Sequence, residues 1–71
     1  MNEDHLNMQI RKFLKKVGIQ SQRDIENAVA RAIAEGRISV GDELKASMRL
    51  NVSGIDLDVT IDGDISIEQD D

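Results

Sequence analysis

The sequence predicts an α+β domain in which two N-terminal helices pack on one face of a three-stranded antiparallel β-meander. Two observations carry this prediction. Apolar residues recur every three or four positions up to about residue 35, and from about residue 43 they alternate with polar residues. A chain of 71 residues has room for one hydrophobic core at most, so we expect a single domain over residues 1–71.

The first helix is expected at about residues 4–17. Glu3 and Asp4 lie at its N-terminal end and lysines at its C-terminal end, as the helix dipole favours. Gly18 can take the left-handed conformation that ends a helix. One helical stripe is formed by Leu6, Ile10, Phe13, Leu14 and Val17.

The second helix is expected at about residues 22–35. Ser21 followed three residues later by Asp24 resembles a capping box, and Gly36 is placed to end the helix. Its buried stripe is predicted to contain Ile25, Ala28, Val29, Ala32 and Ile33.

Three strands are expected at about residues 43–52, 55–62 and 64–68, followed by an acidic tail at 69–71. A two-residue Ser53-Gly54 loop would set Val52 opposite Ile55 and keep the apolar residues on one face. The same register places Arg49 opposite Asp58 and Lys45 opposite Asp62 on the polar face. A second turn is predicted at Asp62-Gly63-Asp64.

Charge is divided unevenly along this acidic chain. Residues 1–41 hold seven Lys and Arg against five Asp and Glu, whereas residues 42–71 hold two against nine. Four cations fall within residues 11–16, on the side of the first helix away from the apolar stripe. The candidate interaction surface is therefore predicted to contain Asn7, Met8, Arg11, Lys12, Lys15 and Lys16.

The leading hypothesis is a non-catalytic protein-interaction or assembly module that uses this basic face to engage an acidic partner protein or a second copy. A homodimer is a real option, because so short a chain without Cys has no disulfide to stabilise it. The alternative is a small nucleic-acid-binding regulator. It is disfavoured because the acidic C-terminal half repels phosphate and no exposed aromatic cluster offers a stacking platform. Two further readings stay open: a purely solubilising basic face, and pairing through uncovered strand edges.

Catalytic, cofactor and metal sites are not expected. The single His lies near the N-terminus, and the carboxylates alternate along an exposed strand where nothing would raise their pKa or exclude water. A calcium loop starting at Asp58 would place Gln69 where a bidentate Glu is needed, and the surrounding alternation demands strand. The chain also lacks an export signal and an apolar run long enough to span a membrane, so we expect a cytoplasmic protein.

The helical half resembles a family of small, uncharacterised bacterial proteins of about seventy residues. The shared pattern is Met1-Asn2-Glu3-Asp4, Asn7-Met8, Ile10-Arg11-Lys12-Phe13-Leu14-Lys15, Val17-Gly18 and Ser21-Gln22-Arg23 before Ile25-Glu26. The resemblance implies a bacterial cytoplasmic domain of unknown function, and it transfers no catalytic residue, ligand or partner. It draws attention to the polar positions beside the apolar stripe.

Overall fold

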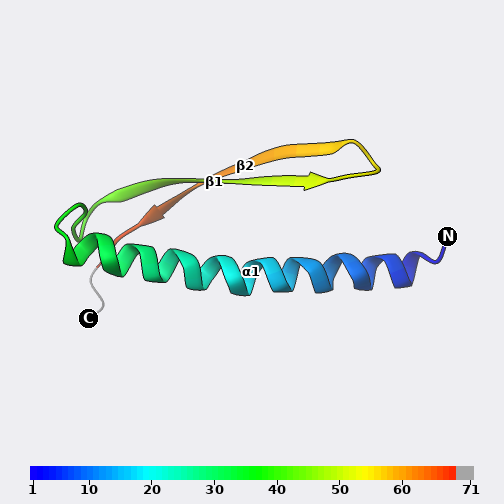
Figure 1. The fold of residues 1–71 in the computed structure, drawn as a ribbon, viewed down its shortest axis with the longest axis horizontal. Coiled ribbons are helices and arrows are strands. Elements are labelled where there is room, and N and C mark those ends of the chain that lie inside the picture. Colours follow the sequence, from blue (N-terminus) through cyan, green and yellow to red (C-terminus); the bar gives the residue numbers. More distant parts are fainter. Residues whose placement is uncertain (69–71) are drawn as a thin grey trace. The chain divides into compact units, whose positions relative to one another are not determined.

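The chain forms one long helix followed by a two-stranded antiparallel hairpin (Figure 1). The structure, a computed structural model, describes residues 1–68, so the predicted acidic tail lies outside the described residues. Helix α1 covers Glu3–Ala34, strand β1 covers Glu43–Val52, and strand β2 covers Leu57–Ser66. The helix and the hairpin belong to two compact units, Met1–Arg37 and Ile38–Asp71. The α+β class is confirmed, whereas the predicted two helices and three strands are wrong.

Helix α1 begins with a side-chain cap. The side-chain oxygen of Asn2, in an extended conformation, accepts a hydrogen bond of 3.0 Å from the backbone N–H of His5. This bond satisfies one of the four N–H groups that a helix start leaves without an intrahelical partner. Glu3 and Asp4 then lie in the first turn, where their negative charge is favourable.

The helix runs through Gly18 without interruption, which corrects the predicted boundary between helices at residues 4–17 and 22–35. Gly18 is helical, and Ser21 lies inside the helix instead of capping a new one. The apolar spacing explains this continuity, because the two expected stripes are in phase and merge through Val17 and Ser21 at intervals of three and four residues. A hydrogen bond of 3.1 Å from Gln20 Nε2 to Asp24 Oδ1 spans the same region.

Gly36 ends the helix as the sequence predicts. Its φ of 75° is left-handed, and its N–H donates to the carbonyl of Ile33. The N–H of Arg37 donates to the carbonyl of Ala32 at 2.9 Å. These two bonds form a Schellman motif, which satisfies carbonyl groups at the helix end.

Alanine substitutions at the two glycines are expected to change stability in opposite directions. Gly18→Ala should stabilise the chain by about 0.5–1 kcal/mol, because a Cβ at this helical position meets nothing within 4 Å. Gly36→Ala should destabilise it by about 1–2 kcal/mol, because an L side chain is strained at this φ. Urea unfolding followed by circular dichroism measures both effects. Destabilisation by Gly18→Ala would instead favour two separate helices.

The hairpin keeps its apolar residues on one face, with a register that differs from the predicted one. Val52 pairs with Leu57, Leu50 with Val59, and Met48 with Ile61. The loop is therefore Ser53–Asp56 and not a two-residue turn, with positive φ at Gly54 and Asp56. Because the pairing moves by two residues, each side chain stays on the expected face.

The predicted third strand is the continuation of β2. Gly63 lies in the strand opposite Ala46, so no turn forms at Asp62-Gly63-Asp64. The alternation already permits this result, since Ile61, Gly63 and Ile65 share one face of an uninterrupted strand. Lys45 pairs with Asp64 and not with Asp62. Both strands are 10 residues long.

Backbone hydrogen bonds extend the pairing beyond the open end of the hairpin. The N–H of Gly41 donates to the carbonyl of Ile67, and the N–H of Ile67 donates to the carbonyl of Asp42 at 2.8 Å. Asp42 also accepts a hydrogen bond of 3.0 Å from the N–H of Ser39 through Oδ2. The segment before β1 is thereby tied to the end of β2.

Arg49 and Asp58 form an exposed ion pair on the polar face of the hairpin. Arg49 Nη2 lies 2.7 Å from Asp58 Oδ2, and Arg49 Nε lies 2.9 Å from Oδ1. Arg49 is directly opposite Thr60, so the contact that the sequence predicts forms diagonally across the strands. Hydrogen bonding by the guanidinium lowers the pKa of the Asp58 carboxyl below its ordinary value.

This ion pair gives the hairpin a pH dependence of known sign. Because the pKa of Asp58 is lower in the folded hairpin, the pair stabilises it above the unfolded pKa of about 4 and ceases to do so as pH falls through the folded pKa. We expect Arg49→Gln to raise the Asp58 titration midpoint toward the ordinary carboxylate value. Side-chain NMR titration of the native chain and the variant measures this change. An unmoved Asp58 midpoint would contradict the ion pair.

Candidate functional site

The predicted interaction residues lie together on the N-terminal half of α1, and all six are exposed. At about 100° per residue, one sector of the helix contains the four cations and Met8, whereas Asn7 lies at the border of the apolar residues. A shallow hollow on this surface is lined by Met8, Arg11, Lys12, Leu14 and Lys15. We call Asn7, Met8, Arg11, Lys12, Lys15 and Lys16 the basic surface.

The cations of the basic surface are not neutralised within the helical unit. Over residues 1–37, the ion pair that the structure contains joins Arg37 to Glu35 at 3.4 Å, at the opposite end of α1. This unit holds seven Lys and Arg against five Asp and Glu, and the remainder of the chain holds two against nine. Within residues 1–37, the cations of the basic surface therefore have no ion-pair partner.

An apolar stripe lies beside the basic surface and follows α1 along its length. Sequence reasoning placed these side chains in a core, yet Ile10 is 49% exposed and Phe13 is 50% exposed. Val17 and Ser21, near the middle of the helix, are half-buried. We use the name apolar stripe for Leu6, Ile10, Phe13, Leu14, Val17, Ser21, Ile25, Ala28, Val29, Ala32 and Ile33.

The hairpin is also incompletely covered on its apolar face. Met48, Val59 and Ile61 are exposed, while Leu44 and Leu50 are half-buried. Among residues 1–68, Ile67 is the one buried apolar residue, at 9% exposure. Two-stranded hairpins are marginally stable at best when their apolar face is open to water. Periodicity predicts which residues share an apolar face, but it does not say what covers that face. The exposure of these apolar residues was therefore not predictable from the sequence.

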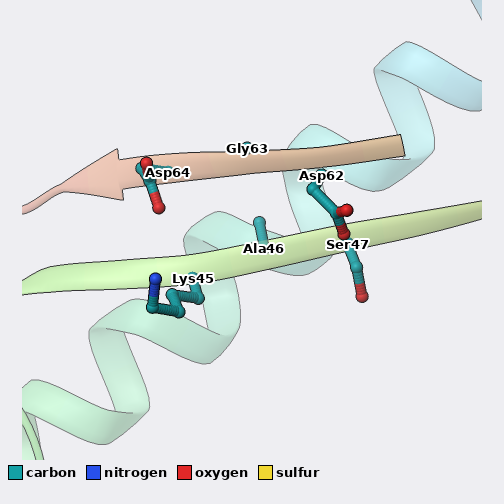
Figure 2. Close-up of a pocket in the computed structure, with 6 residues that line it drawn as sticks. All are labelled: Lys45, Ala46, Ser47, Asp62, Gly63 and Asp64. Carbon is teal, nitrogen blue, oxygen red and sulfur yellow. The ribbon is translucent and has the colours of Figure 1, made fainter. Parts of the chain in front are cut away.

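A second hollow lies on the hairpin and is lined by polar and small residues of both strands. Figure 2 shows Asp62, Gly63 and Asp64 of β2 beside Lys45, Ala46 and Ser47 of β1, and these six residues line an open hollow. Lys45 is paired with Asp64 across the strands, and Ser47 with Asp62. Over residues 1–68 the structure contains no cluster of three His, Cys, Asp or Glu side chains placed to hold a metal ion.

The length and polarity of α1 bear on membrane insertion. Its 32 residues would exceed the thickness of a bilayer, but charged side chains are distributed along it. Within the described part of the chain, no helix combines the length and the apolar character needed to cross a membrane.

Comparison with known proteins agrees with the resemblance seen in the helical half and extends it over the hairpin. The model of a family of unknown function, DUF6494, matches residues 1–68. No curated protein and no solved structure matches the chain. Because the match covers α1, β1 and β2 together, the chain belongs to the DUF6494 family.

Proposed function

We propose that this protein is a non-catalytic protein-interaction module and that the basic surface of α1 engages an acidic surface on a partner protein. The supporting observation is that the cations of the basic surface form no ion pair within residues 1–37 and lie beside the exposed side chain of Met8. Positive charge steers an acidic partner and selects it, while apolar area supplies most of the binding free energy.

The arrangement of the basic surface suits a folded partner better than a nucleic acid. Met8, an adaptable apolar side chain, lies among the cations, and the hollow contains the apolar Leu14. Phosphate contacts would need cations in excess, yet the whole chain carries a net charge of −5. A partner with a few carboxylates around an apolar centre fits both features.

Charge reversal tests the proposed function. Lys12→Glu with Lys15→Glu should leave the helix content unchanged, because both side chains are exposed, and should abolish capture of the acidic partner. The measurement is a pull-down from a lysate of the source organism with the full chain as bait, followed by direct binding of each captured protein. Circular dichroism checks the fold of each variant.

The matched control is Arg23→Glu with Arg31→Glu, which makes the same charge change on the other half of α1. This control variant should retain the partner that the Lys12 and Lys15 variant loses. Equal capture by both variants would contradict the proposal. Capture that disappears after nuclease treatment would assign the basic surface to nucleic acid instead.

A further inference from the structure

We infer that the apolar stripe of α1 is a homodimer interface, in which a second copy of this chain binds through the same stripe with its helix antiparallel. The inference goes beyond the proposed function because it concerns the apolar stripe and a defined partner. Three observations carry it: the exposure of the stripe within the helical unit, the order of large and small side chains along α1, and the order of charges beside them.

Nothing within the helical unit covers the apolar stripe. Leu6 is 42% exposed, Ile10 49% and Phe13 50%. From Leu6 to Ile33 the stripe follows a helix for about 40 Å. Covering apolar side chains over this length removes them from water, which is the main favourable term in protein association.

The order of side-chain sizes along the stripe makes it complementary to itself in the antiparallel direction. Large residues occupy its N-terminal half and small ones much of its C-terminal half. With Leu6 at the level of Ala32 of the second copy, this register sets Leu6 and Ile10 opposite small alanine side chains, whereas Phe13 meets a large one. The layers, each occurring twice about the two-fold axis, are Leu6 with Ala32, Ile10 with Ala28, Phe13 with Ile25, and Val17 with Ser21.

The charges beside the stripe favour the same direction. In this register Arg11 lies within one residue of the level of Glu26 of the second copy, and both follow the same edge of the stripe. Lys16 lies within two residues of the level of Asp24 along the other edge. A parallel pair would instead bring the four cations at residues 11–16 of the two copies together, which is repulsive.

The middle of the basic surface lies outside the dimer interface, and only its edge residues Arg11 and Lys16 border both. Lys12 and Lys15 point away from the centre of the stripe, so they stay exposed in the antiparallel pair. The two proposals are therefore separable. The Lys12→Glu with Lys15→Glu variant should remain dimeric, and loss of the acidic partner in that variant would not affect this inference.

Engineered disulfides test the register, because the native chain has no Cys. Two single-Cys chains, Arg11→Cys and Glu26→Cys, are oxidised separately and as a refolded mixture. The antiparallel register predicts a covalent dimer in the mixture and none in either chain alone. In this register two copies of residue 11, or two copies of residue 26, lie roughly 21–24 Å apart along the helices, too far for a disulfide. A mixture of Arg11→Cys with Asn27→Cys is the control, since Asn27 lies at the same level on another side.

Charge exchange provides a second readout that needs no disulfide. Arg11→Glu should weaken dimerisation about tenfold, and adding Glu26→Arg should restore it to within about threefold, because the pair recurs at both ends of the dimer. Cross-linking of Arg11→Cys with itself would overturn the antiparallel register. The interface would be overturned if the native chain is monomeric and the Arg11→Cys with Glu26→Cys mixture cross-links no more than the Asn27→Cys control. The proposed function would not be affected by that result and is tested by its own pull-down.

Discussion

Ile10→Asp is expected to weaken the proposed dimer so strongly that the variant is monomeric at the concentrations at which the native chain begins to dimerise. Ile10 lies on the midline of the apolar stripe, in its N-terminal half, and is at the level of Ala28 of the second copy in the proposed register. A carboxylate there would be buried without a partner, at a cost of several kcal/mol, and twofold symmetry applies that cost twice. Dimer affinity should fall by more than about 100-fold.

Gln9→Asp is the matched control for this substitution. It adds the same carboxylate one residue away, on a side of α1 that is exposed and lies outside the stripe. Sedimentation equilibrium should find the control dimeric and Ile10→Asp monomeric, with similar helix content by circular dichroism. If the two variants associate equally, the stripe is not the interface.

Leu50→Asp is expected to unfold the hairpin. Leu50 is half-buried on the apolar face and pairs with Val59. A charge at this position loses apolar burial and needs solvation, for a total cost of about 2 kcal/mol, which is large for a two-stranded sheet. Amide hydrogen exchange should show loss of protection in β1 and β2.

Asn51→Asp is the control for the hairpin prediction, because Asn51 is the next residue and lies on the exposed face opposite Asp58. Protection in this variant should stay close to the native pattern. Equal loss of protection in both variants would mean that the apolar face of the hairpin does not hold the two strands together.

The C-terminal end of α1 was predictable because one local signal determines it. The continuation through Gly18 was not predictable, because a glycine that can end a helix competes there with an apolar pattern that continues it. Gly36 ends α1 as predicted, because its left-handed φ satisfies carbonyls that the helix leaves free. Gly18 has no such role. The apolar residues continue at intervals of three and four past Gly18, and uninterrupted helix hydrogen bonding outweighs the about 1 kcal/mol that a mid-helix glycine costs.

For the hairpin, the sequence predicted which residues share a face of the strands but not the register of their pairing. Alternation predicted correctly which side chains share a face, since a shift of two residues preserves it. It did not determine the loop, because loops of two and four residues both keep Val52 on the apolar side. Gly63 resembled a turn residue, yet its place opposite Ala46 lets β2 continue to Ser66.

The basic surface was identifiable from sequence because helical spacing alone gathers its members on one side of α1. Its function stays a prediction. The apolar stripe was also identifiable, but periodicity cannot say whether a face is covered by the same chain or by another molecule. Small size and the absence of Cys made a homodimer an option from the outset, and the exposed Ile10 and Phe13 give that option a defined surface.

Sedimentation equilibrium of the full native chain tests the central claim most directly. The apolar interface predicts a mass of twice 7.9 kDa that persists in high salt, because apolar burial is not screened by ions. A single-chain mass up to about 100 μM, at low and high salt, would contradict the claim that a second copy covers the apolar stripe.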